Sequence, residues 1–317
     1  MNLALADVGR IIDKAATIVV TTHVHPDGDA IGSMLGLYHG LSERHKVRLI
    51  LDDSVPPMLG FLPGAENIER VDAAGRLAAD LLVIVDAGDI DRIGAVATNV
   101  SAPRLNIDHH KSNNGFADYN YVDTTVSSTG EIVYRLLRLM GKRFTIDLAV
   151  NLYTAIATDC GFFRYANTTP DTMICCAHLM EIGVRPDLIS EALETRPVGV
   201  LRALAKTLST LEIEDGGRIA VITAGPDVLQ EADNDTEGFI NFPRAVEGVE
   251  LAIMFTVFAS AVRVSFRSKS VDVSRLAAAF GGGGHIRAAG CTIEGNLETV
   301  KPRVLAAARN MVGGKEL

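Results

Sequence analysis

Residues 22–33 read THVHPDGDAIGS and place two imidazoles and two carboxylates within seven positions, from His23 to Asp29. Imidazole and carboxylate groups bind divalent cations, and they also transfer protons in catalysis. The segment follows a hydrophobic run, TIVVTT. PDGD on its own is typical of a tight turn, so this segment alone supports either a turn or a metal site.

Three further segments place the same residue types at the end of an apolar run or of a helix. They are Asp86 in LLVIVD, residues 108–110 (DHH) after LNI, and Asp159 in ATDCGFFRY. A single aspartate after a strand is usually a turn former or a helix N-cap. The recurrence of acids and histidines in four segments favours one shared site over four unrelated turns.

The chemistry of such a site points to metal ions. Several carboxylates at one place repel each other unless cations lie among them. Mixed Asp and His ligands suit Mn²⁺ or Mg²⁺, and imidazole favours the transition metal. A structural zinc site is not indicated, because the four cysteines have no CxxC spacing. Two ions about 3.5–4 Å apart can share a carboxylate and lower the pKa of a bridging water for attack on phosphorus.

The predicted elements explain how these segments can meet. The predicted strands are residues 17–22, 46–51, 81–86 and the start of 103–110, and the predicted helices are 30–44, 127–141, 147–159 and 171–183. Alternating apolar strands and helices indicate an α/β fold with a mostly parallel sheet flanked by helices. Because ligands bind beyond the carboxyl ends of such strands, we expect the four segments at one edge of the sheet.

The second half of the chain predicts a different domain. Residues 184–206 carry two prolines and mixed charge and are predicted to be a helical connector. Strands in GGRIAVITA, VELAIMFTVF and AVRVSFRS, a glycine-rich loop and a helix at 297–312 follow. We therefore predict a metal-binding domain (1–185), a helical linker (186–206) and a smaller C-terminal α+β substrate-binding domain (207–317).

A phosphate-binding face is predicted in the C-terminal domain. RVSFRSK (263–269) alternates, so its two arginines and the serine share one strand face, which suits a phosphate but is also typical of a solvated face. In GGGGH (281–285), glycine amides can approach an anion closely. The predicted substrate contacts are Arg267 and His285 first, with Ser265, Gly283, Gly284 and Arg263 behind them.

Composition limits the partners. The chain has 317 residues, is 48% hydrophobic and has a net charge of −9, which argues against extended duplex nucleic acid as a partner. A local metal or arginine cluster can still bind a small phosphorylated substrate. The longest apolar run, LAIMFTVFASAV, is too short to span a bilayer, and no signal peptide is recognised. We expect a cytoplasmic protein with no membrane partner.

Together, the motifs HxxPDGDAxGS, VDAGD, DHH and ATDxGxFRY resemble those of the DHH phosphoesterase superfamily, and VRVSFRSK with GGGGHIRAAG resembles its substrate-binding domain. The chain is most similar to the bifunctional nanoRNase/pAp phosphatase group. This resemblance implies a hydrolase of phosphate esters that trims short single-stranded RNAs to nucleoside monophosphates. It would also dephosphorylate 3′-phosphoadenosine 5′-phosphate (pAp). Both reactions would proceed by in-line attack of a metal-bridging hydroxide.

The resemblance also implies a role for each motif residue. Two Mn²⁺ ions are implied, with Mg²⁺ or Co²⁺ as alternatives. The implied ligands are His23 and Asp27 for one ion, Asp29, His109 and Asp159 for the second, and Asp86 as a catalytic bridge between both. Gly28 is expected to let a tight turn bend without a Cβ clash, so that Asp27 and Asp29 diverge toward the two ions. His110 would lie beside the scissile phosphate as an acid or charge stabiliser, and Arg267 would hold the far phosphate of the substrate.

Other functions of the same fold stay open. A cyclic di-AMP or linear pApA phosphodiesterase would present adenylate phosphates to the same loop. Family II inorganic pyrophosphatases share the metal site, but this sequence lacks their SRKKQ-type segment. A non-catalytic nucleotide-binding sensor would not need all six ligands. The sequence does not decide the oligomeric state, and a homodimer is compatible with it.

Overall fold

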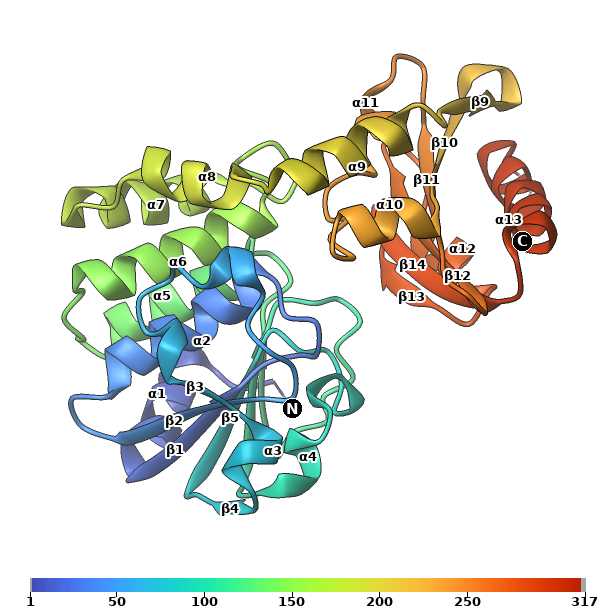
Figure 1. Ribbon diagram of the computed structural model, residues 1–317. Coiled ribbons are helices and arrows are strands. Elements are labelled where there is room, and N and C mark those ends of the chain that lie inside the picture. The colour runs from blue at the N-terminus through green and yellow to red at the C-terminus, as the bar shows by residue number, and fades with distance from the viewer. Residues whose placement is uncertain (1, 315–317) are drawn as a thin grey trace. The chain divides into compact units, whose positions relative to one another are not determined.

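A computed structural model describes residues 2–314, without the side chain of His285, and the chain forms two compact units, Met1–Glu194 and Thr195–Leu317 (Figure 1). Helix α8 (Pro186–Glu194) buries Ile189 and Leu193 in the core of the first unit. Helix α9 (Val198–Leu208) buries Val200 and Ala203 in the second. The domain bounds predicted from the sequence stay a prediction.

The first unit is built on a six-stranded sheet in the order β3-β2-β1-β5-β7-β8, in which every pairing is parallel. The strands are β1 (Thr17–Thr21), β2 (Lys46–Leu51), β3 (Ile68–Arg70), β5 (Leu81–Val85), β7 (Arg104–Asp108) and β8 (Tyr119–Val122). The chain runs outward from β1 to β3 and returns to the other side of β1 with β5. Ligands of open α/β sheets bind at such a reversal of strand order.

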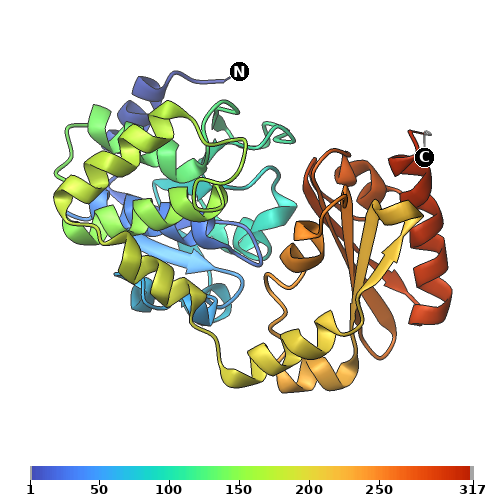
Figure 2. The same ribbon diagram turned by 90° about the horizontal axis from the view of Figure 1, so that it is seen from above.

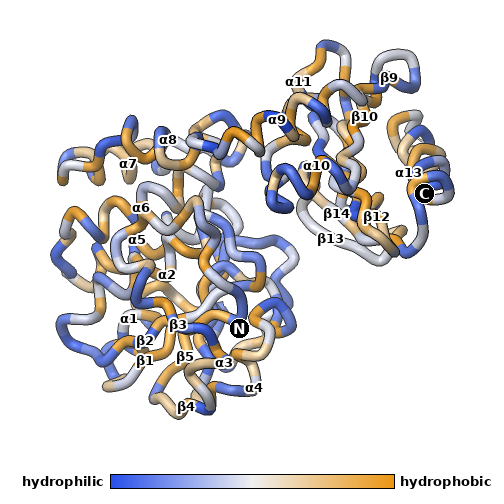
Figure 3. The backbone as a smooth tube through the Cα atoms, in the orientation of Figure 1, coloured by the Kyte–Doolittle hydropathy of each residue, from blue (hydrophilic) through white to orange (hydrophobic). Residues whose placement is uncertain are grey.

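Helices cover both faces of this sheet, so alternate strand residues enter different cores. Val83 and Val85 of β5 pack in the larger core, whereas Leu82 and Ile84 pack in the smaller one. The larger core also takes residues from α1 (Leu5–Lys14), α2 (Gly28–Leu41), α5 (Thr129–Leu139), α6 (Ile146–Asp159) and α7 (Pro170–Ile182), and the smaller core from α3 (Val71–Ala74) and α4 (Val96–Asn99). Figure 3 shows these strands as a largely hydrophobic centre.

A row of glycines brings α2 unusually close to α6. Glycines recur every fourth residue of α2, at 28, 32, 36 and 40, and therefore lie on one side of the helix. A Cβ atom on Gly32 would lie 2.5 Å from the backbone oxygen of Asn151 and 2.8 Å from the Cβ of Ala155. A Cβ on Gly28 would lie 2.4 Å from Oγ1 of Thr158. This packing sets the first turn of α2 beside the last turn of α6.

The second unit contains a mixed six-stranded sheet in the order β13-β14-β12-β11-β10-β9, in which only β10 and β11 pair in parallel. The strands are β9 (Glu212–Glu214), β10 (Ile219–Ala224), β11 (Leu251–Val257), β12 (Ala261–Ser268), β13 (Gly283–His285) and β14 (Ala288–Glu294). Its helices are α9, α10 (Pro226–Glu231), α11 (Asn241–Ala245), α12 (Val273–Ala278) and α13 (Leu297–Val312). Helices α12 and α13 cover one face of the sheet, and α9 and α10 the other (Figures 1 and 2).

The predicted fold class is confirmed, including the parallel N-terminal sheet and the smaller mixed-sheet domain. The strand pair β4 (Leu77–Ala78) and β6 (Val100–Ser101) was not predicted, because two-residue strands leave no periodicity. The predicted glycine loop is partly wrong, since Gly283 and Gly284 belong to β13 and pair with β14. Over residues 2–314, no helix combines the length and the apolar character needed to cross a membrane.

The glycine row gives a stability test. Gly32→Ala should lower the free energy of unfolding by about 1–3 kcal/mol or more, because the added methyl group meets backbone that cannot rotate away. Gly9→Ala in α1 is the matched control, since the nearest neighbours of its Cβ would be side chains and not backbone, with the flexible Met140 at 3.1 Å and Leu136 at 3.8 Å. Chemical denaturation of both variants measures the difference. Equal stability of the two would contradict close packing of α2 on α6.

Candidate metal centre

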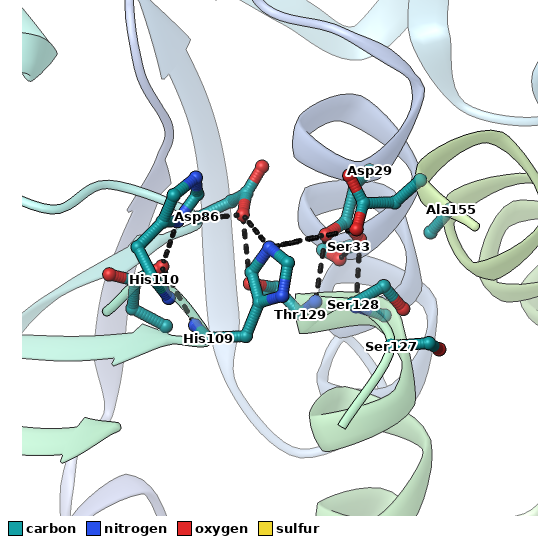
Figure 4. A network of polar contacts seen from close by, with 12 residues as sticks. Asp29, Ser33, Asp86, His109, His110, Ser127, Ser128, Thr129 and Ala155 are labelled. Atoms are coloured by element: carbon teal, nitrogen blue, oxygen red, sulfur yellow. Dashed lines mark hydrogen bonds and ion pairs between the residues drawn. The ribbon is translucent and has the colours of Figure 1, made fainter. Parts of the chain in front are cut away.

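The predicted metal-site residues come together at the carboxyl edge of the parallel sheet, beside the reversal between β1 and β5. His23 follows β1, Asp86 follows β5, and His109 and His110 follow β7. Asp27 is the N-cap of α2, with Asp29 in the first turn, and Asp159 ends α6. Figure 4 shows the ring of His109 between Asp86 and Asp29.

Two groups of donor atoms lie side by side, because His109 of one group lies 3.5 Å from Asp86 of the other. In each group the three atoms lie within 4.8 Å of one another, and the groups are His23, Asp27 and Asp86, and Asp29, His109 and Asp159. His109 Nε2 lies 3.9 Å from Asp29, 3.8 Å from Asp159 and 3.5 Å from Asp86 Oδ1. The other oxygen of Asp86, Oδ2, lies 3.6 Å from His23 Nε2. A third group of such atoms contains Asp86, His109 and His110.

The backbone at Asp86 is strained. Its φ of +59° lies in the left-handed region, which residues other than glycine seldom adopt. Its amide donates to the carbonyl oxygen of Ile107 in the neighbouring strand, which holds this conformation. Strained residues of this kind cluster at functional sites, because the surrounding structure must compensate a cost of about 1–3 kcal/mol.

The carboxylates have different pKa values because their surroundings differ. Burial and the nearby charges of Asp86, Asp159 and Asp27 raise the pKa of Asp29 well above its usual range. Burial and the charges of Asp86 and Asp27 likewise raise the pKa of Asp159. Burial also favours the neutral form of Asp86, but the surrounding imidazoles outweigh it and hold the pKa well below its usual range.

This arrangement fits divalent cations. Asp29 and Asp86 are buried and Asp159 is partly buried, so their mutual repulsion is weakly screened. Oxygen and imidazole donors in two adjacent groups are a donor set that Mn²⁺ or Mg²⁺ accepts. His23 Nδ1 lies 2.9 Å from the carbonyl oxygen of Val24, a contact that orients the ring with Nε2 toward Asp86.

His110 is held by a second carboxylate. Its Nδ1 donates to Asp108 Oδ1 over 2.6 Å, and Asp108, fully buried, also accepts hydrogen bonds from Asn113 and from the backbone amides of His109 and His110. Burial favours the neutral imidazole, but the hydrogen bond to Asp108 and the charge of Asp86 raise the pKa of His110 to about 9. Both interactions favour the protonated form of the ring.

The structural reason for Gly28 differs from the prediction. We expected glycine there to let a tight turn bend, but its φ lies outside the left-handed region and it starts α2. Glycine is instead required because any Cβ would collide with Thr158. Asp27 and Asp29 diverge because one caps the helix and the other lies within its first turn.

The predicted substrate residues of β12 share one face of the second sheet. Along β12, Arg263, Ser265 and Arg267 alternate with buried Val264 and Phe266, as predicted. Arg267 is paired with Ala288, which is paired with residue 285, so the register sets positions 267 and 285 in one row. The side chain of His285, one of the predicted contacts, lies outside the described part of the chain.

Glycine is needed at 284 for packing and not at 283. At Gly284, where φ is +139°, a Cβ would lie 2.6 Å from the Cα of Ala289. A Cβ on Gly283 would meet nothing within 4 Å, so this position is open.

Arg263 contacts Thr236 at 3.5 Å and the ring of Phe258 at 5.8 Å.

One further histidine and three aromatic residues lie within the sequence motifs but outside the groups of donor atoms. His25 is exposed and pairs with Asp53 at 3.1 Å. Phe162 and Phe163 pack against the core of the first unit, and Tyr165 is 38% exposed.

Two contacting residues were missed in the sequence. Thr129 donates from Oγ1 to Asp86 and from its backbone amide to Asp29, and Asn167 donates to Asp159. In the sequence Thr129 looks only like part of a helix cap, and no spacing links Asn167 to Asp159.

Comparison with known proteins agrees with the fold. Residues 17–158 match the DHH family, N-terminal domain, and residues 228–314 match the DHHA1 domain. Over 295 residues the chain is 36% identical to the bifunctional oligoribonuclease and PAP phosphatase NrnA of Thermus thermophilus, covering 92% of this chain and 89% of that protein. The protein of the same name from Bacillus subtilis is 27% identical over 293 residues, covering 90% of this chain and 91% of that protein.

A solved structure also matches both units. It is the crystal structure of an exopolyphosphatase-related protein from Bacteroides fragilis, with a TM-score of 0.90 and 28% identity over 98% of this chain and 97% of that one. The chain belongs to the DHH family, with both the DHH and the DHHA1 domains.

The raised pKa values of Asp29 and Asp159 predict proton release on metal binding. A cation that takes these oxygens displaces their protons, so Mn²⁺ affinity should rise with pH above the usual carboxyl range, where these two groups lose their protons. Calorimetric titration in two buffers of different ionisation enthalpy measures the protons released. Asp159→Asn should bind Mn²⁺ more weakly and release fewer protons. Asp72→Asn, which removes an exposed carboxylate in α3, is the control. A Mn²⁺ affinity that does not change with pH would contradict the raised pKa values of Asp29 and Asp159.

Proposed function

We propose that this chain hydrolyses short single-stranded oligoribonucleotides to nucleoside monophosphates and removes a phosphate from pAp, using two Mn²⁺ ions. The observation that carries the proposal is the pair of donor groups that lie side by side, with His109 of one group 3.5 Å from Asp86 of the other. Two relatives named bifunctional oligoribonuclease and PAP phosphatase, similar over about nine tenths of the chain, support this choice of substrates.

The proposed ligands follow the two donor groups. His23 and Asp27 would hold one ion, Asp29, His109 and Asp159 would hold the other, and Asp86 would contact both through its two oxygens. When bound, such a pair of cations supplies an activated water and neutralises charge on the phosphate.

His110 would supply the proton in this reaction. Asp108 orients the ring through Nδ1, and the positive charge of the imidazolium favours a phosphate beside it. Proton donation from the ring to the leaving oxygen would prevent an alkoxide from building up. His110→Asn would remove both the charge and the proton.

The face formed by β12, β14 and β13 would bind a substrate phosphate. Arg267 offers a planar guanidinium for it, Ser265 a hydroxyl two residues away on the same strand face, and Gly283 an open backbone position. His285 and Gly284 complete the proposed set, with Arg263 at its edge. The net charge of −9 supports short substrates over long duplexes, because binding a long duplex requires an extended basic surface.

A substrate panel tests the proposal. The purified chain with Mn²⁺ should convert labelled RNAs of two to five nucleotides to monophosphates and pAp to AMP, and chromatography of the products measures both reactions. Cyclic di-AMP, pyrophosphate and inorganic polyphosphate should react at least about tenfold more slowly, which corresponds to about 1.4 kcal/mol in the barrier. Preferred turnover of any of these three would replace the proposed substrate class.

His110→Ala tests the proposed proton donor with the same substrate panel. It should lose about 10²–10⁴ in turnover, as expected when a general acid is removed, while still binding Mn²⁺. His25→Asn should keep full activity, since His25 is exposed and asparagine tolerates its φ of +55°. Wild-type turnover in the His110 variant would exclude the proposed role of this residue.

A further inference from the structure

Residues 127–131 (SSTGE), at the start of α5, contact the metal-site carboxylates of three other elements. The segment contacts Asp29 of α2 and Asp86 after β5 directly, and Asp159 of α6 through one intervening side chain. None of its own side chains belongs to the two groups of donors described above.

Backbone amides of this segment hold Asp29. Thr129 N donates to Asp29 Oδ2 over 2.7 Å, and Gly130 N donates to Oδ1 over 2.8 Å. Ser33 Oγ, one turn further along α2, donates to the same Oδ1 over 3.0 Å. A side chain at 130 would collide with Ala155, whose Cβ would be 2.5 Å away, so glycine allows this close approach. Both oxygens of Asp29 are thereby fixed in direction (Figure 4).

The hydroxyl group of Thr129 sets the rotation of the Asp86 carboxylate. Thr129 Oγ1 donates to Asp86 Oδ1 over 3.0 Å. This hydrogen bond holds Oδ1 on the side of His109, whose Nε2 lies 3.5 Å from it. The other oxygen, Oδ2, then points toward His23, whose Nε2 lies 3.6 Å from it. One hydrogen bond therefore directs the two oxygens of Asp86 toward the two donor groups.

Asn167 links the segment to the third carboxylate. Its Nδ2 donates to the carbonyl oxygen of Ser127 over 2.8 Å and contacts Asp159 Oδ2 at 3.3 Å. Displacement of Ser127 would move Asn167 and with it the orientation of Asp159.

Glu131 anchors the segment from within the protein. Its side chain is fully buried, and Oε2 accepts hydrogen bonds from Ser127 N at 3.2 Å, Ser127 Oγ at 2.8 Å and Thr172 Oγ1 at 2.9 Å. Arg135 pairs with its other oxygen. A buried carboxylate is retained only when it is paired and hydrogen-bonded, and here the partners join α5 to α7.

We propose that residues 127–131 align Asp29, Asp86 and Asp159 before metal arrives, and that Thr129 is the positioning residue for Asp86. This inference deepens the proposed function, because it assumes that the three carboxylates bind cations. It requires no particular substrate. Hydrogen bonds behind metal ligands commonly contribute 10–100-fold to metal affinity.

Thr129→Val tests the inference, because valine keeps the shape and the backbone amide and removes only the hydroxyl group. Mn²⁺ affinity, measured by calorimetry without substrate, should fall about 10–100-fold, and kcat should fall more than KM changes. Thr129→Ser, which restores the hydroxyl group, should return both to near wild type. Rescue by serine separates positioning of Asp86 from a purely structural role at this site.

Wild-type Mn²⁺ affinity in Thr129→Val would overturn the inference. If valine unfolds the chain, Glu131→Gln supplies the second test: its neutral amide loosens the segment, and Mn²⁺ affinity should again fall about tenfold or more. Unchanged affinity in that variant would equally contradict the alignment role. Because metal binding is read without substrate, failure of the substrate panel would leave this result intact.

Discussion

The repulsion among carboxylates at the sheet edge is the constraint on which the rest of the structure depends. Two unit charges about 4 Å apart repel by about 4 kcal/mol near a protein surface, and by more where water is excluded. Asp29 and Asp86 are buried and Asp159 is partly buried, so little water screens the charges of these three carboxylates. The protein compensates with imidazoles around Asp86 and amides on Asp29, and it leaves two carboxyl groups with raised pKa values. A bound cation would relieve that remaining imbalance.

The fold delivers these charged groups by packing backbones closely. Parallel strands bring His23 and Asp86 to one edge, but α2 and α6 reach it only because the glycines of α2 admit the backbone of α6. The same closeness recurs at Gly130, where α5 approaches α6. Small residues therefore determine the positions of the acids as much as the strands do.

Much of this could be predicted from the sequence, because local patterns carry it. Apolar runs predicted the strands, and the acids and histidines at their ends predicted the cluster around Asp86. Contacts between distant segments leave no such pattern. The role of Gly28 was misread because Thr158 lies far away in the chain, and Thr129 looked like an ordinary cap residue. Strand β13 was missed because glycine has a low strand propensity.

The central claim is that two cations lie side by side with Asp86 between them. The most direct test is a crystal grown with Mn²⁺, in which anomalous scattering locates each ion. Two peaks about 3.5–4 Å apart are predicted, one among His23, Asp27 and Asp86 and the other among Asp29, His109, Asp159 and Asp86. A single peak away from Asp86, or none at this edge of the sheet, would contradict the account.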